Sequence, residues 1–125
     1  MKAKSILIIE DEYALGSALF LLVTRMGHLA SLDASASAGL ESLEKQHFDA
    51  AVIDIGLPDQ SGLEVLEAIR KSGSSMPVLV ITAHATLRHA IDSQKHGATA
   101  YMNKPLNLEE LKQQLTALLE FGQQV

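Results

Sequence analysis

Apolar residues fall along the chain in two alternating patterns, and the first is a set of short continuous runs. Runs of four or five β-branched or apolar residues, bounded by turn residues, predict buried strands. The strongest are Ser5–Ile9, Ala50–Ile53 and Pro77–Ile81, and two weaker ones are Leu29–Leu32 and Thr99–Met102. Because these runs are apolar throughout, they suit a sheet that is covered on both faces.

Between the runs, apolar residues recur at helical spacing. The predicted helices cover about Tyr13–Met26, Ser35–Lys45, Gly62–Lys71, Thr86–His96 and Leu108–Glu120. A left-handed glycine commonly ends a helix, and four glycines stand where one is needed: Gly27, Gly73, Gly97 and Gly122. At the helix starts, Ser61 with Glu64 predicts a capping box, and Asn107 with Glu110 predicts a similar cap.

Five strand–helix units in strict alternation predict an α/β fold, with a parallel sheet and helices on both of its faces. We see no repeat or internal linker, so residues 1–125 are expected to form one domain. In such a sheet every strand ends on the same edge, which is where ligand chemistry gathers.

Polar residues stand at four of these strand ends. The run 5–9 is followed by Glu10-Asp11-Glu12, and the run 50–53 by Asp54. Thr82 and Lys104-Pro105 follow the last two runs. The sequence therefore predicts that two or three acids, a hydroxyl and an ammonium converge.

The converging charges need an explanation, because one lysine cannot offset three acids. Two carboxylates about 4 Å apart repel each other by roughly 4 kcal/mol at an effective dielectric near 20. A hard divalent cation such as Mg²⁺ would offset this. A shared proton, which raises the pKa of one acid, would do so too, and the residues alone favour neither. With a metal, the set has the parts for phosphoryl transfer, including a carboxylate nucleophile.

Composition limits the kinds of binding partner that this chain is expected to have. The net charge of −5 argues against a nucleic-acid-binding surface in this chain, and the absence of cysteine excludes disulfides and thiolate metal sites. No apolar run approaches the length that spans a membrane. We therefore expect no membrane partner and a cytoplasmic location.

Four segments, in this order and at this spacing, resemble the receiver (CheY-like) domain of two-component response regulators. They are "ILIIEDE" (6–12), "DIGLP" (54–58) followed by Gly62, "VITAHA" (80–85) and "GATAYMNKP" (97–105). The resemblance covers essentially the whole chain. It implies a doubly wound, flavodoxin/CheY-like (βα)5 fold with strand order 2-1-3-4-5.

The resemblance also implies roles for the residues at the strand ends. Asp54 matches the phosphoacceptor, and Thr82 and Lys104 match the hydroxyl and the lysine that pair with the phosphoryl group. Mg²⁺, with Mn²⁺ as the alternative ion, would be held by carboxylates and one backbone carbonyl: Glu10, Asp11, Asp54 and the carbonyl of Gly56. The family more often has Asp where this chain has Glu10.

Further positions match residues that, in the family, change conformation or set the lifetime of the phosphoryl group. Tyr101 matches the aromatic residue that turns when Thr82 moves. Gly56 and His84 match the two places that border the phosphoryl group and set its lifetime. Pro105 would follow a cis peptide bond.

These roles imply a signalling domain that catalyses only its own Mg²⁺-dependent phosphorylation and dephosphorylation. A sensor histidine kinase or a phosphotransfer protein would supply the phosphoryl group. The face of the fourth helix, the fifth strand and the fifth helix would then contact an output partner, by self-dimerisation or through an attached effector. "TAHA" and "HGATAY" resemble receivers of transcriptional activators. A DNA-binding effector would lie outside these residues.

Three other functions fit less well. A haloacid-dehalogenase-type phosphatase needs a second acid where this chain has Gly56. A flavodoxin-type module needs a phosphate-cradling loop where the acids 10–12 would repel phosphate. A docking module that never takes phosphate would not need the complete set of acids, hydroxyl and lysine.

Some polar residues are expected to have ordinary roles. Glu12 suits a solvated helix start, where acids are favoured. Surface or helix-end positions are expected for four histidines: His28, His47, His89 and His96. Asp49 and Asp59 suit turns.

Overall fold

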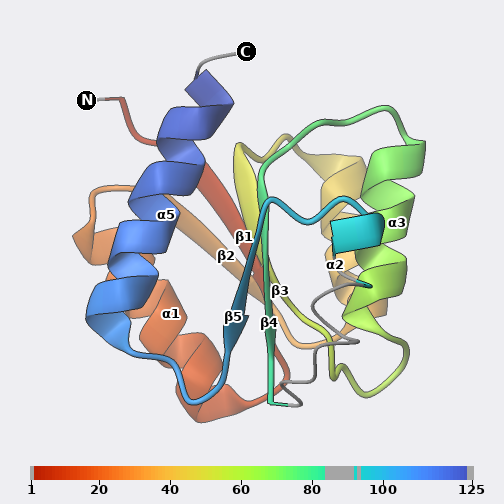
Figure 1. The fold of residues 1–125 in the computed structure, drawn as a ribbon, viewed down its shortest axis with the longest axis horizontal. Helices are drawn as coiled ribbons and strands as arrows, with labels where there is room; N and C mark the ends of the chain where they lie inside the picture. The colour runs from red at the N-terminus through yellow and green to blue at the C-terminus, as the bar shows by residue number, and fades with distance from the viewer. Residues whose placement is uncertain (1, 84–91, 93, 124–125) are drawn as a thin grey trace.

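A five-stranded parallel sheet forms the centre of the computed structural model, which describes residues 2–83, 92 and 94–123 (Figure 1). Its strands are β1 (Ser5–Ile9), β2 (Leu29–Asp33), β3 (Ala50–Asp54), β4 (Val78–Thr82) and β5 (Ala100–Asn103). They lie in the order β2-β1-β3-β4-β5, and every neighbouring pair is parallel. The predicted sheet and its strand order are therefore confirmed.

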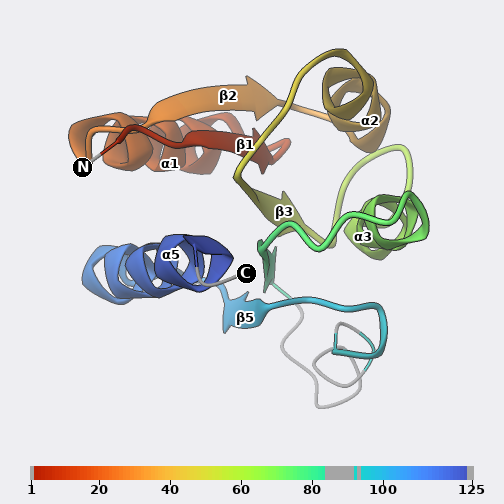
Figure 2. The ribbon, with the colours of Figure 1, turned by 90° about the horizontal axis from the view of Figure 1, so that it is seen from above.

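Helices cover both faces of the sheet. The described helices are α1 (Tyr13–Arg25), α2 (Ala36–Lys45), α3 (Gly62–Lys71) and α5 (Leu108–Gln123). Figure 2 shows α1 and α5 on one face and α2 and α3 on the other. The fourth predicted helix, Thr86–His96, lies mostly outside the described residues. No described helix has the length and apolarity needed to cross a membrane.

Successive residues of the central strands point to opposite faces of the sheet, which explains their continuous apolar runs. In β1, Ile6 and Ile8 pack with α1 and α5, whereas Leu7 and Ile9 pack with α2 and α3. All four side chains are fully buried. Each face thus has its own core.

Strands β3 and β4 each run one residue further than predicted, so Asp54 and Thr82 are their last residues. Backbone pairing continues to the ends of these strands, because Ile55 N–H donates to the Ile81 carbonyl at 2.9 Å. Lys104 N–H likewise donates to the Thr82 carbonyl at 2.8 Å. The polar residues are therefore held by the sheet itself and not by a loop.

Most predicted helix ends are confirmed. Gly27, Gly73 and Gly97 have φ of +90°, +90° and +92°, which is the left-handed region. The capping box of Ser61 and Glu64 is present at the start of α3. Ahead of α5, the Asn107 side chain accepts the Glu110 N–H at 3.0 Å.

One predicted helix end is wrong, and one histidine is more buried than a surface position would allow. Gly122 does not end the last helix, because α5 continues to Gln123. A glycine inside a helix costs only about 1 kcal/mol, and the buried Leu118 and Leu119 anchor the preceding turn. His28 lies just after α1, at the helix end that is one of its two expected positions, and its N–H donates to the Val23 carbonyl at 3.2 Å. The side chain is buried, and its Nδ1 accepts the Lys4 N–H at 3.0 Å. That bond satisfies a backbone donor just ahead of β1.

Asp59, expected as a turn acid, caps a helix from a distant loop. Its two carboxylate oxygens accept the N–H groups of Ala36 and Ser37, at 3.0 and 2.9 Å, at the start of α2. These hydrogen bonds, first that of Ser37 and then that of Ala36, lower the pKa of the Asp59 carboxyl. The loop that follows Asp54 is thereby bonded to α2.

Arg70, in the last turn of α3, joins two other loops. Its Nε and Nη2 donate to the Gly97 carbonyl at 3.0 and 2.8 Å, and its Nη1 donates to the Ser74 carbonyl at 3.1 Å. Burial lowers the pKa of the guanidinium. Ser74 precedes β4 and Gly97 precedes β5, so Arg70 connects the amino ends of these strands.

Candidate functional site

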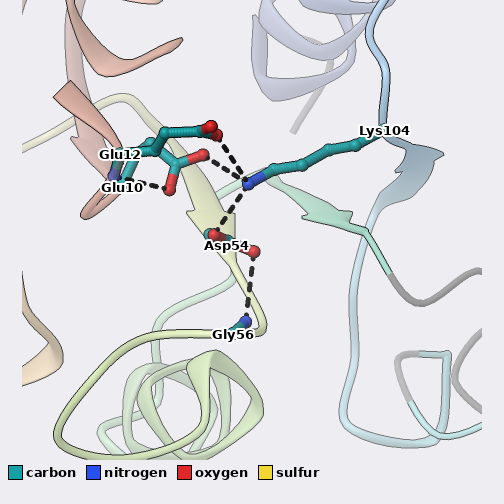
Figure 3. Close-up of polar contacts among 5 residues, drawn as sticks. All are labelled: Glu10, Glu12, Asp54, Gly56 and Lys104. Atoms are coloured by element: carbon teal, nitrogen blue, oxygen red, sulfur yellow. Dashed lines mark hydrogen bonds and ion pairs between the residues drawn. The ribbon is translucent and has the colours of Figure 1, made fainter. Parts of the chain in front are cut away.

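The ammonium of Lys104 lies between two buried carboxylates at the carboxyl edge of the sheet (Figure 3). The Lys104 Nζ is 2.7 Å from Glu10 Oε1 and 3.0 Å from Asp54 Oδ2. Glu10 is 2% exposed and Asp54 is 3% exposed. Glu10 follows β1, Asp54 ends β3 and Lys104 follows β5, so three separate strands bring these groups together.

The close packing of these charges shifts two pKa values. Burial, together with a hydrogen bond to Asp54, raises the pKa of Glu10 to about 7, although Lys104 acts in the opposite direction. Burial disfavours the charge on Lys104, but hydrogen bonds to Glu10 and Asp54 outweigh this and raise the pKa of the lysine. One lysine therefore does not fully offset the carboxylates, as the sequence predicted.

Glu10, Asp11 and Asp54 form a cluster that could hold a metal ion. Each offers a carboxylate oxygen, and these oxygens lie within 4.8 Å of one another. Glu10 and Asp54 are buried whereas Asp11 is exposed, so the cluster is reached from the Asp11 side. Hard oxygen ligands and the incompletely offset charge of Glu10 both fit a divalent cation such as Mg²⁺.

The turn after β3 holds the second oxygen of Asp54. Gly56 N–H donates to Asp54 Oδ1 at 3.1 Å (Figure 3). A Cβ placed on Gly56 would lie 3.9 Å from the same oxygen, so any side chain at position 56 would border the carboxylate. At Gly62 a Cβ would lie 2.0 Å from the Asp54 carbonyl oxygen. Helix α3 therefore starts directly against the backbone of Asp54.

The remaining predicted site residues lie on β4 and β5 or just after them. Thr82 is buried at the end of β4, which pairs with β3 and β5. The Lys104–Pro105 peptide bond is cis. Tyr101 packs against the α2–α3 core, and its buried hydroxyl has no hydrogen-bond partner among the described residues. Burial raises the pKa of that hydroxyl. His84 lies outside the described residues.

Glu12 belongs to this site too, although only a solvated helix start was predicted for it. It stands at the N-cap of α1 with its side chain 62% exposed, and its Oε1 is 3.7 Å from Lys104 Nζ (Figure 3). A helix that begins directly at the sheet edge keeps its first acid near that edge. The run of three acids was the signal that could have revealed this contact.

A hollow of about 600 Å³ lies away from these residues. It is lined mainly by residues that precede β1, β3 and β4, among them Lys4, Phe48 and Pro77. Since it contains none of the residues that converge on Lys104, its position separates it from the chemistry of the carboxyl edge.

Comparison with known proteins gives a consistent result. The response regulator receiver domain family matches residues 6–116. Two-component response regulator PhoP of Pseudomonas aeruginosa is 36% identical over 114 residues, which are 91% of this chain and 51% of that protein. Transcriptional regulatory protein BasR of Escherichia coli is 40% identical over the same shares. The chain thus spans about half the length of the curated relatives it matches.

A solved structure is similar over nearly its whole length. The crystal structure of a CheY-like response regulator receiver domain protein from Methanospirillum hungatei has a TM-score of 0.93 at 31% identity. The match covers 98% of each chain. The fold of this chain and the fold of that protein are therefore the same.

Proposed function

This chain belongs to the response regulator receiver domain family, and we propose that its Asp54 accepts a phosphoryl group from a phosphohistidine. One observation carries the proposal: a buried carboxylate has one oxygen 3.0 Å from Lys104 Nζ and the other bound by the Gly56 N–H. The receiver is a signalling domain of two-component systems. We propose that it spans residues 1–125 and catalyses only its own phosphorylation and dephosphorylation.

In the proposed transfer, a carboxylate oxygen of Asp54 attacks phosphorus in line with the leaving group. The new P–O bond forms an acyl phosphate, and the P–N bond to histidine breaks with its electron pair going to the imidazole. Lys104 stabilises the negative oxygens of the transferring group, because its ammonium already lies against Asp54. The Gly56 N–H holds the carboxylate in one orientation.

We propose that Glu10, Asp11, Asp54 and the carbonyl of Gly56 hold Mg²⁺, with Mn²⁺ as the alternative. The clustered carboxylate oxygens support this assignment. The bound ion would supply charge neutralisation at the phosphoryl oxygens. Thr82 is proposed to donate its hydroxyl to the phosphoryl group, and Tyr101 to turn as Thr82 moves. Gly56 and His84 are proposed to set the lifetime of the acyl phosphate.

The proposed partners are a sensor histidine kinase or a phosphotransfer protein, followed by an output partner. Formation of the acyl phosphate replaces the single negative charge of the Asp54 carboxylate by about 1.5 to 2 negative charges. If the output partner binds one conformation of the receiver more tightly than the other, this change in charge shifts the equilibrium between the two conformations. We propose that the contact face includes β5 and α5, either in a homodimer or with an effector. The name of BasR, a transcriptional regulatory protein, supports an effector that acts in transcription.

Acetyl phosphate with Mg²⁺ tests the assignment of Asp54. We expect intact-protein mass spectrometry to show one added phosphoryl group on the wild-type chain and none on Asp54→Asn. Glu41→Gln is the control, since Glu41 is an exposed acid on α2 whose carboxylate pairs with the exposed Lys45, and this variant should be phosphorylated as the wild type is. Phosphorylation of Asp54→Asn to the wild-type extent would mean that another residue is the acceptor. No phosphorylation of the wild type would favour a docking module that never takes phosphate.

A further inference from the structure

We propose that Glu12 is a specificity-determining residue of the phosphoryl-transfer site, and that its carboxylate selects among phosphodonors by their charge. The inference rests on the proposed function of Asp54. Glu12 is not one of the proposed metal ligands, and it is not one of the residues proposed to contact the phosphoryl group. Its side chain nevertheless faces Lys104.

Three carboxylates surround the Lys104 ammonium, and they differ in exposure. Glu10 and Asp54 lie 2.7 and 3.0 Å from Nζ and are buried, whereas Glu12 lies 3.7 Å away with 62% of its side chain exposed (Figure 3). The buried pair forms the floor of the site. Glu12 therefore places a negative charge on the solvent side of the lysine.

Glu12 differs from the buried acids in what else its carboxylate can do. Within the described part of the chain, the oxygens that could share a metal ion come from Glu10, Asp11 and Asp54, and Glu12 is not among them. Of the three carboxylates around Lys104, those of Glu10 and Asp54 belong to the proposed metal-binding set and that of Glu12 does not. The Glu12 charge is thus not neutralised by the ion that the site is proposed to bind.

An incoming phosphodonor must bring its negative oxygens to Lys104 and Asp54, and therefore close to Glu12. Repulsion by Glu12 scales with the charge of the donor. For charges about 6 Å apart in a water-like dielectric, each extra unit of donor charge lowers the rate about threefold. A dianionic small molecule is disfavoured relative to a donor with one negative charge fewer.

Two small phosphodonors of different charge provide the test. Acetyl phosphate is a dianion at neutral pH, whereas phosphoramidate carries one net negative charge because its nitrogen is protonated. Initial rates of phosphorylation would be measured by mass spectrometry with both donors, at saturating Mg²⁺ and low ionic strength. We expect the ratio of the acetyl phosphate rate to the phosphoramidate rate to rise about threefold in Glu12→Gln and about ninefold in Glu12→Lys. At high salt these increases should shrink, since exposed charges are screened.

Glu120→Gln is the matched control, because it removes the same charge from an exposed position near the far end of α5. Its donor ratio should equal that of the wild type. A donor ratio unchanged in both Glu12 variants, or changed equally by Glu120→Gln, would overturn the inference while phosphorylation itself remained intact. Failure of the wild type to accept phosphate from either donor would instead overturn the proposed function, and the inference with it.

Discussion

At the scale of single residues, Glu10 is the acid whose ionisation is most altered by the fold. The residue is 2% exposed, and its carboxyl has a pKa of about 7, against an ordinary value of 4.5. Because the pKa is raised in the folded state, the folded protein binds this proton more tightly than the unfolded chain does. The contribution to stability is complete below pH 4.5 and is lost as pH rises through about 7.

We therefore expect the free energy of unfolding, measured in EDTA, to fall between pH 4.5 and 8 by at most about 3 kcal/mol from this group. Glu10→Gln cannot ionise, so its stability should change less over the same range. Urea unfolding of both proteins at several pH values, followed by circular dichroism, measures the difference. Parallel pH profiles for the two proteins would show that Glu10 does not titrate in this window.

The sequence could predict which residues meet at the site but not how they pair. Strand ends and parallel topology bring Glu10, Asp54 and Lys104 to one edge, whatever their side chains do. The rotamers then decide that Lys104 is closer to Glu10 than to Asp54, and they depend on burial that is set by the whole fold. For the same reason, the run of three acids could suggest that Glu12 lies near the lysine but could not predict the distance of 3.7 Å between them.

At the scale of elements, the junction of β3 and α3 determines where Asp54 lies. Gly62 begins α3 so close to β3 that a Cβ would lie 2.0 Å from the Asp54 carbonyl oxygen and 2.9 Å from Ile53 Cγ2. The first of these neighbours is backbone and cannot turn aside. Strand and helix must separate if position 62 carries a side chain.

Gly62→Ala should therefore destabilise the protein by about 2 kcal/mol or more, as overpacking of a close contact does. Gly56→Ala is the comparison, because its nearest neighbour would be 3.9 Å away and its φ is not in the left-handed region. We expect little change in the stability of that variant. Thermal unfolding of the three proteins by circular dichroism would measure both effects, and equal losses in the two variants would argue against the close approach.

The periodicity of apolar residues predicted where the helices and strands lie, but it predicted their end residues less well. The run Ala50–Ile53 predicted β3 because it is apolar, but backbone pairing extends the strand to Asp54, whose side chain is not. Gly122 had the residue type of a helix end, yet packing of the preceding turn continues α5 past it. Local residue type is thus overruled where tertiary contacts hold the backbone.

At the scale of the whole molecule, stability comes from two cores that share one sheet. Ile8 belongs to the core beneath α1 and α5, and Ile69 to the core beneath α2 and α3. Both side chains are buried. The two residues lie in separate clusters, so a change in one core is not compensated by repacking in the other.

Ile8→Val and Ile69→Val should each lower the free energy of unfolding by about 0.5 to 1.5 kcal/mol, since each removes one buried methylene. The double variant should lose the sum of the two within about 0.5 kcal/mol. All variants should unfold in a single transition, because both cores depend on the same strands. Urea denaturation followed by circular dichroism tests this, and two separate transitions would mean that the faces unfold independently.

The position of Arg70 has a consequence for how β4 and β5 can move. Its guanidinium fixes the loops ahead of both strands, whereas the residues proposed to respond to phosphate stand further along or just beyond them. Displacements should therefore be smallest near Ser74 and Gly97 and grow toward the carboxyl edge. Phosphorylation at the carboxyl edge should therefore rotate β4 and β5 about their amino ends and should not shift the whole sheet.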